Sequence, residues 1–274
     1  MSISVRLAPA VPAAVGEARG RRLVLQVGFI AVILGVWSAV RLADVMGTDV
    51  LPAPWTVVQR WYDGVRTVAY WSTVADTVRS ALGGLIAATV VGVPVGLITG
   101  TYSRVERSTR VVVEFGRSFP VIAILPVMLL VMGASLTMKG VVVFVACVFP
   151  LIIQAQYGAK SVTSAIDETV RSYRIGRLLR FRRVVLPAAG PSVWTGLRIA
   201  STMAVLVSIG VEILTSVPGI GHVIVTSQQD RNSANAYAYI FTAGVLGFCV
   251  NKLAQWAESR ALSWRPPHDQ DEAS

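Results

Sequence analysis

We predict that this chain folds into an all-α, polytopic membrane protein with about six transmembrane helices, and two observations support that fold class. First, 54% of the 274 residues are hydrophobic and only 15% are charged, whereas about a quarter of the residues in a soluble domain carry charge. Second, the mean hydropathy is +0.61, and charge-free stretches of about 20 residues recur along the sequence. A chain this apolar is neither a soluble globular domain nor a disordered one.

Six stretches are long enough to cross the roughly 30 Å hydrocarbon layer as helices. Their approximate bounds are Leu23–Val40, Ser80–Gly100, Val121–Met138, Gly140–Tyr157, Ile199–Val217 and Ala236–Ala254. Little more than Lys139 and Gly140 separates the third stretch from the fourth. We therefore expect these two to form a tight helical hairpin, in which Pro126 and Pro150 only kink their helices.

The distribution of basic residues predicts the orientation of the chain in the membrane. In a six-span arrangement, 19 of the 25 Lys and Arg residues fall on one side and six on the other. Because Lys and Arg concentrate in cytoplasmic loops, both termini are expected in the cytoplasm, and the net charge of +10 reflects topology rather than nucleic-acid binding. This divides the chain into a cytoplasmic tail (1–22), a transmembrane domain (23–257) with a long cytoplasmic loop (158–198), and a second cytoplasmic tail (258–274).

A cleaved signal peptide is the alternative explanation for the first apolar stretch, Leu23–Val40. Its apolar run is longer than the 7–15 residues of a signal-peptide core, and no small-residue cleavage site of the A-x-A kind follows it. A transmembrane helix is therefore favoured for this stretch.

The sequence offers no catalytic, metal or cofactor site. Cys147 and Cys249 lie within predicted spans, where cysteine behaves as a small apolar residue. His222 and His268 fall on opposite sides of the membrane, and no spacing of His, Cys, Asp and Glu resembles a metal site. The phosphate-binding pattern G-x-x-x-x-G-K-[ST] is absent, so a motor driven by ATP would have to be another polypeptide.

The long cytoplasmic loop begins with a predicted amphipathic helix. Ser164 followed by Asp167 is a capping-type start. Ile166, Val170 and Tyr173 then recur on one helical face, which we expect to be an exposed apolar face too small to form its own core.

Basic residues flank this apolar face, and two explanations of the helix remain open. Arg171 and Arg174 lie off the face, and the helix should be interrupted near Gly176 and stopped by Pro187. Such a helix rests on anionic lipid headgroups or docks against a partner protein, and its periodicity favours neither.

The same loop carries a family resemblance. Its segments are Glu168-Thr-Val, Arg182-Arg-Val-Val-Leu-Pro187, Pro191 and Gly196-Leu-Arg-Ile199. They resemble the EAA loop of bacterial ABC-importer permeases, particularly those of the nitrate, sulfonate and taurine type, where a Glu-Ala-Ala-like start precedes a Gly by six positions. Here Arg174 stands where that Gly is expected, and Gly176 follows two residues later.

Further segments of the chain are similar to the same family. They are Leu51-Pro-Ala-Pro54, Arg117-Ser-Phe-Pro-Val-Ile-Ala-Ile-Leu-Pro126, Phe149-Pro-Leu-Ile152, Glu212 and Gly219-Ile-Gly-His-Val-Ile224. The resemblance implies the type I ABC-importer permease fold. It also implies a second permease copy, two cytoplasmic ATPase subunits and an extracytoplasmic binding protein as partners, beside membrane lipid.

The resemblance implies roles for residues of the loop and a class of substrate. The residues expected to couple the chain to the ATPase are Ile166, Asp167, Glu168, Val170, Arg171, Tyr173, Arg174 and Gly176. The solute would be a sulfonate, taurine or nitrate, although related permeases carry vitamin precursors. A stand-alone secondary transporter is the alternative, but such carriers usually show repeated halves and several ionisable residues at mid-membrane.

Glu212 is the clearest charge within a predicted span. A charged side chain at a helix centre costs about 2.5–3.5 kcal/mol on insertion scales and therefore calls for a partner or water. On a helix it shares one polar stripe with Ser201, Ser208 and Thr215. Either this stripe packs against neighbouring helices, with Glu212 bonded to backbone near the outer loop, or it lines the translocation path.

Glycines recur every fourth residue in the second predicted span, at positions 92, 96 and 100. Small residues at this spacing allow two membrane helices to approach closely. We expect Gly92, Gly96 and Gly100 to form a packing face, located at the contact between two permease copies.

The predicted orientation can be tested by labelling. Single cysteines introduced at Ser164 and at Ser233 should react with an impermeant thiol reagent from opposite faces of the membrane, because an odd number of spans separates them. Labelling of both positions from the same side of intact cells would refute the six-span arrangement.

Overall fold

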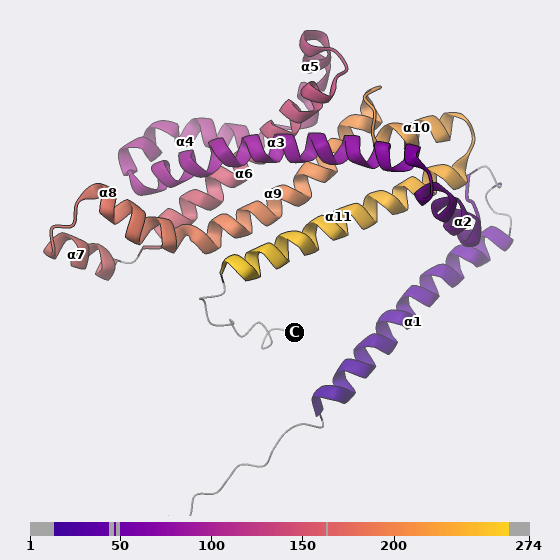
Figure 1. Cartoon of the computed structure of the whole chain (residues 1–274), viewed down its shortest axis with the longest axis horizontal. Helices are drawn as coiled ribbons and strands as arrows, with labels where there is room; N and C mark the ends of the chain where they lie inside the picture. Colours follow the sequence, from indigo (N-terminus) through magenta and orange to yellow (C-terminus); the bar gives the residue numbers. More distant parts are fainter. Residues whose placement is uncertain (1–13, 44–46, 48–49, 163, 263–274) are drawn as a thin grey trace, which may run out of the picture.

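The structure is a computed structural model that describes residues 14–43, 47, 50–162 and 164–262. Within these residues the chain is helical, without a β-strand, which confirms the all-α prediction (Figure 1). The elements are α1 (Ala14–Leu42), α2 (Pro54–Val65), α3 (Val68–Thr101), α4 (Ser103–Ser118), η1 (Val121–Ile124), α5 (Leu125–Met132), α6 (Leu136–Lys160), α7 (Ser164–Ser172), α8 (Arg177–Arg180), η2 (Phe181–Val185), α9 (Leu186–Leu214), α10 (Ile220–Gln229) and α11 (Ser233–Ala261).

The number of candidate membrane spans agrees with the prediction of about six. Five helical stretches of the described residues are long and apolar enough to cross a membrane. A sixth candidate is the bent pair formed by α4 and the segment Val121–Met132, whose two parts meet at 87°.

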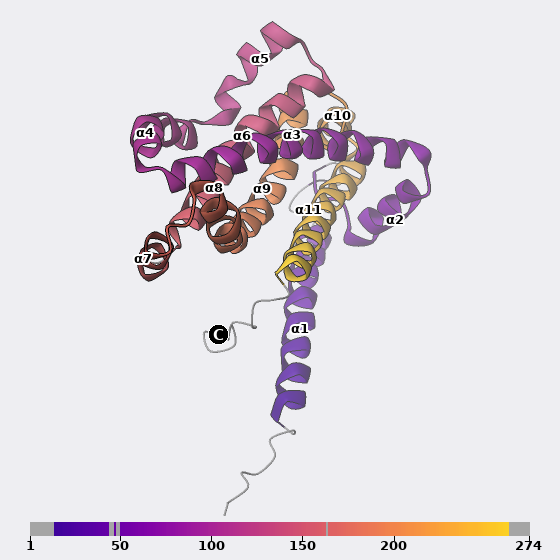
Figure 2. The same cartoon turned by 60° about the vertical axis from the view of Figure 1, so that its left-hand side comes forward.

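Helices α3, α6 and α9 form the centre of the bundle, and α11 packs against α9 (Figures 1 and 2). Small and branched apolar side chains fill the space between the central helices, among them Ala88, Cys147, Leu151 and Ala204. Helix α1 diverges from the bundle in both views (Figures 1 and 2). Helices α7 and α8 lie at the opposite end of the molecule from helix α10 (Figure 1).

The third predicted span and the hairpin after it need correction. The stretch Val121–Met138 is not one helix, because α5 ends at Met132 and α6 already begins at Leu136. The chain reverses at Gly133, whose φ of 66° suits glycine, and Ser135 then caps α6 by accepting a hydrogen bond from the backbone N–H of Met138. Lys139 and Gly140, predicted to separate two helices, therefore lie inside α6.

Pro187 does not stop the helix that precedes it, contrary to the prediction. Residues Arg177–Leu214 form one long helical stretch through α8, η2 and α9. The segment η2 is π-helical, and the backbone N–H of Leu186 donates to the carbonyl of Phe181. Pro187 follows this π-helical turn directly, so the change of hydrogen-bond register falls where the missing N–H of proline would otherwise interrupt a regular α-helix.

The predicted glycine packing face exists, but its partner is α6 of the same chain. A Cβ atom built on Gly96 would lie 2.3 Å from the carbonyl oxygen of Ile152. One built on Gly100 would lie 2.6 Å from the carbonyl oxygen of Gln156. The expectation that this face contacts a second permease copy is therefore wrong, because α6 already occupies it.

Substitution at this face should destabilise the bundle. We expect Gly96→Ala to lower the free energy of unfolding by about 1–3 kcal/mol, because the added methyl group meets backbone rather than a movable side chain. The matched control is Gly83→Ala on the same helix, where a Cβ atom would meet nothing within 4 Å. Thermal unfolding of the purified variants should show a loss for Gly96→Ala only; equal melting temperatures would contradict the assigned packing.

Candidate functional site

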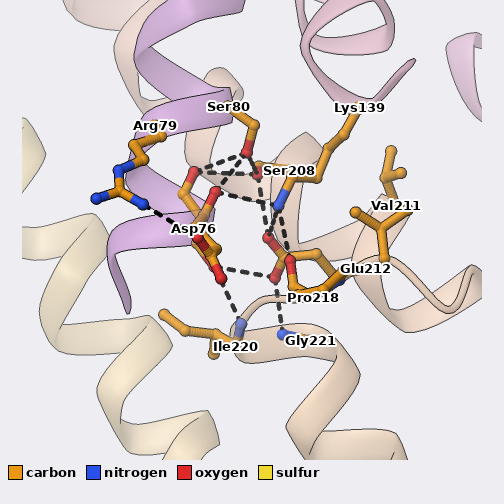
Figure 3. A network of polar contacts seen from close by, with 12 residues as sticks. Asp76, Arg79, Ser80, Lys139, Ser208, Val211, Glu212, Pro218, Ile220 and Gly221 are labelled. Carbon is orange, nitrogen blue, oxygen red and sulfur yellow. Dashed lines mark hydrogen bonds and ion pairs between the residues drawn. The ribbon is translucent and has the colours of Figure 1, made fainter. Parts of the chain in front are cut away.

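A fully buried ion pair joins α6 to α9. The Nζ atom of Lys139 lies 2.6 Å from Oε1 of Glu212, and both side chains have 0% of their surface exposed (Figure 3). Lys139 lies near the start of α6 and Glu212 near the end of α9. Burying either charge alone would cost several kcal/mol, so each of the two side chains can be buried only because the other lies beside it.

The ammonium group of Lys139 has three donors, and the structure supplies three acceptors for them. Besides the Glu212 carboxylate, it donates to the carbonyl oxygen of Asp76 at 3.2 Å and to that of Pro218 at 3.1 Å. These two carbonyls belong to α3 and to the segment between α9 and α10. One lysine thereby ties three other parts of the chain to α6.

The second carboxylate oxygen of Glu212 accepts hydrogen bonds from two further elements. The hydroxyl of Thr77 on α3 donates to it at 3.1 Å, and the backbone N–H of Gly221 on α10 donates at 2.8 Å. The N–H of Ile220 donates in turn to the Thr77 hydroxyl at 3.0 Å. The first two residues of α10 thus point their N–H groups into the network, where the helix dipole favours a negative charge.

The turn before α10 can adopt its path only because glycine occupies two positions. Gly219 has a φ of 153°, and a Cβ atom there would lie 2.1 Å from Cδ of Glu212. A Cβ atom on Gly221 would lie 2.4 Å from the carbonyl oxygen of Ile209. The backbone of the turn therefore lies directly against the Glu212 carboxylate.

The polar stripe predicted on α9 divides between two environments. Ser208 and Glu212 are fully buried, and Oγ of Ser208 lies 3.2 Å from that of Ser80 on α3. These two residues fit the packing explanation. Ser201 is buried on the same helix, at 8% exposure. Thr215 lies past the end of α9 in extended backbone, is partly exposed and donates to the carbonyl of Val211, so the prediction of one helical stripe is wrong for Thr215. A role of any of the four in lining a translocation path stays a prediction.

Sequence reasoning missed Lys139 as a member of this site and expected backbone as the main partner of Glu212. The structure does provide a backbone donor, Gly221, but the principal partner is Lys139. The available signal was a pair of opposite charges, each alone within an otherwise apolar stretch. Assigning Lys139 to a loop removed the reason to pair them.

At the other end of the bundle, α7 presents part of the predicted apolar face. Ile166 is 44% exposed and Tyr173 is 79% exposed, but Val170 is only 6% exposed. The prediction that all three form an exposed face is therefore wrong for Val170. The chain turns back after α7, and the N–H of Ile175 donates to the carbonyl of Val170 at 3.1 Å.

The bend after α7 falls on Arg174, the residue that stands where the resembling family has Gly. Its φ of 50° lies in the left-handed region, which costs a non-glycine residue about 1–2 kcal/mol. Gly176 has an ordinary φ of −61°. Glu168 is exposed, and the side chains of Asp167 and Arg171 lie outside the described residues.

The comparisons with known proteins agree with this architecture. Residues 92–262 match the model of a family described as the binding-protein-dependent transport system inner membrane component. The chain is 26% identical over 260 residues to the nitrate import permease protein NrtB of Leptolyngbya laminosa, covering 91% of each chain. It is 25% identical over 249 residues to the taurine transport system permease protein TauC of Escherichia coli, covering 89% of this chain and 90% of the relative.

A further curated relative and a solved structure extend the likeness. The putative aliphatic sulfonates transport permease protein SsuC of Bacillus subtilis is 25% identical over 240 residues, which cover 87% of each chain. An inward-facing structure of the MetNI methionine ABC transporter superposes with a TM-score of 0.61 at 18% identity, covering 77% of this chain and 97% of that one. The structural match shows a shared fold.

A double-mutant cycle tests the ion pair. We expect Lys139→Met alone to lower the free energy of unfolding by about 3–5 kcal/mol, because it leaves the buried Glu212 carboxylate without its partner. Adding Glu212→Gln should restore part of that loss, since no unpaired charge then remains.

Thermal unfolding of the two single variants and the double variant gives the coupling energy. The control is Arg110→Met, which breaks the exposed pair with Glu114 and should leave the melting temperature nearly unchanged. Losses that simply add in the double variant would show that the two charges do not stabilise each other.

Proposed function

Because the chain belongs to the family of binding-protein-dependent transport system inner membrane components, we propose a division of labour along its length. It is the membrane-spanning permease subunit of an ABC importer, a transport subunit rather than an enzyme. In this proposal the α10 end receives a solute from a binding protein, and the α7 end takes up the motion of an ATPase that is a separate chain.

The basic residues support an arrangement in which the α7 end faces the cytoplasm. The exposed arginines Arg177, Arg182 and Arg183 lie at that end, next to the coupling helix. An ATPase must act from the side on which ATP is present, and the excess of Lys and Arg marks the same side. Both termini are then cytoplasmic under the six-span count, in a multi-pass protein of the inner membrane.

The observation that supports docking at α7 is its exposed apolar surface. Ile166 on α7 and Tyr173 in the turn directly after α7 are exposed at the end of the bundle, and Leu178 on α8 is 73% exposed beside them along the chain. Apolar side chains of this size are normally covered in a functional assembly. A groove of the ATPase that closes over them would transmit its movement through α8 and η2 into α9, with which they form one helical stretch.

We further propose an assembly of two permease copies, two ATPase subunits and one binding protein. The two permease copies would form a homodimer, because a two-fold axis would match two identical ATPase subunits to two α7 helices. The relatives named for nitrate, aliphatic sulfonates and taurine support a small solute of that kind. A vitamin precursor is the alternative cargo.

Docking at α7 can be tested by placing a charge on its apolar side chains. Ile166→Asp and Tyr173→Asp should each abolish co-purification of the ATPase at unchanged permease expression, because the groove would have to bury an unpaired carboxylate. The matched control is Ser172→Asp, which adds the same charge to an exposed position of the same helix.

A lipid-surface helix would behave differently. Its contact with the membrane would depend on basic residues and on anionic lipid. Arg177→Gln combined with Arg182→Gln would then detach the α7 helix from the surface of anionic vesicles, while the permease with either Asp substitution would still co-purify with the ATPase. Normal ATPase co-purification with Ile166→Asp and Tyr173→Asp would contradict the docking proposal.

A further inference from the structure

An open groove lies between α3 and α6, next to the buried ion pair. Its volume is about 400 Å³. The lining residues that bear on its chemistry are Arg79, Gly83 and Ala87 from α3 and Thr137, Gly140 and Phe144 from α6. It combines one guanidinium group and the hydroxyl groups of Ser80 and Thr137 with small and apolar side chains.

Packing inside the protomer accounts for Gly84 in this groove, where a Cβ atom would lie 2.6 Å from the carbonyl oxygen of Gly140, but not for Gly83 and Gly140. A Cβ atom on Gly83 would meet nothing within 4 Å, and one on Gly140 would come no nearer than 3.9 Å to the carbonyl oxygen of Ser80. This separates them from Gly96 and Gly100, where α6 leaves no room for a side chain. The groove therefore contains space at these two positions that no side chain of the protomer fills.

Arg79 places a charge at one end of this groove. Its side chain is 73% exposed, and it follows the network residues Asp76 and Thr77 by one helical turn or less. Figure 3 shows its guanidinium pointing away from the Lys139 ammonium. The predicted topology places Arg79 on the outer side, directly before the second span, so the Arg79 end of the groove opens toward water.

The charge that the groove displays belongs to Arg79, which forms an ion pair with Asp76. Because the Arg79 side chain is 73% exposed, this pair is weak and leaves most of the guanidinium available to a ligand. Lys139 and Glu212 offset each other in the interior. Asp76 accepts a hydrogen bond of 3.4 Å from Nη1 of Arg79, but its side chain is only 25% exposed and does not line the groove. One bond to Asp76 uses one of the five guanidinium donors, whose fork geometry matches the oxygens of a carboxylate, sulfonate or nitrate group.

We propose that this groove is the outer part of the translocation path and that Arg79 binds the oxyanion group of the solute there. The inference rests on the proposed transport function and deepens it by naming a residue and a class of ligand. The ligand is a small oxyanion, attracted by the exposed guanidinium and held among water, the Thr137 hydroxyl and small side chains. The size of the groove falls in the range of small-molecule sites.

The test measures electrostatic selection without needing the natural solute. Thr137→Cys is made in full-length permease lacking Cys147 and Cys249, assembled with its ATPase in membranes. The rate of modification by anionic sulfonatoethyl methanethiosulfonate is divided by the rate for its cationic trimethylammonium analogue. Because both reagents attack the same thiolate, the ratio cancels the intrinsic reactivity of the cysteine.

Arg79 should set this ratio. Arg79→Gln should lower it roughly fivefold, the effect of one charge on two oppositely charged reagents at several ångströms in a water-rich groove. Arg79→Lys should retain most of the ratio, and Asp76→Asn should raise it because the neighbouring negative charge is removed. The matched control Arg66→Gln removes an exposed arginine that donates to the Tyr62 hydroxyl and should leave the ratio unchanged.

Two outcomes would overturn the inference. If neither reagent modifies Thr137→Cys, lipid or a second permease copy covers the groove. If both reagents react but neither Arg79→Gln nor Asp76→Asn changes the ratio, Arg79 does not select the ligand. In either case retained co-purification of the ATPase would leave the proposed function of the chain intact, so the two failures are distinguishable.

Discussion

A lysine and a glutamate buried side by side in an apolar bundle impose a demanding condition on everything around them. Every donor of the Lys139 ammonium and both oxygens of the Glu212 carboxylate must find partners, because water is excluded from both side chains. The partners come from α3, α10 and the segment before α10. The position of four helices and one turn at this end of the bundle therefore follows from satisfying a single pair of charges.

The two ends of the molecule differ in how tightly the surrounding contacts hold them. At the α10 end, the network and the glycines of the turn leave little freedom, since Gly219 and Gly221 lie directly against Glu212 or its helix. At the α7 end, a short helix with exposed apolar side chains precedes a bend at Arg174, a residue in a strained backbone conformation. Under the proposed coupling of α7 to an ATPase, the α10 end would stay fixed while the α7 end moves.

How far the sequence predicted this structure depends on the range of the interactions involved. Apolar composition is local, so most spans and the all-α class were predicted correctly. The fourfold glycine spacing predicted a packing face, but spacing along one helix does not identify the helix that fills it. Lys139 was assigned to a turn because its charge argues against a membrane helix, and the compensating Glu212 lies 73 residues later. Arg174 was recognised only as a departure from a family pattern, and its positive φ explains why that pattern favours glycine.

Backbone hydrogen exchange shows whether the Glu212 carboxylate holds the α9–α10 turn in place. In the wild-type complex the amides of Ile220 and Gly221 should exchange slowly, because they donate to Thr77 and Glu212 in the interior. In Glu212→Ala, peptides covering residues 218–224 should exchange at least about tenfold faster, while the peptide covering α7 should not change. Unchanged protection of the turn in that variant would contradict the account.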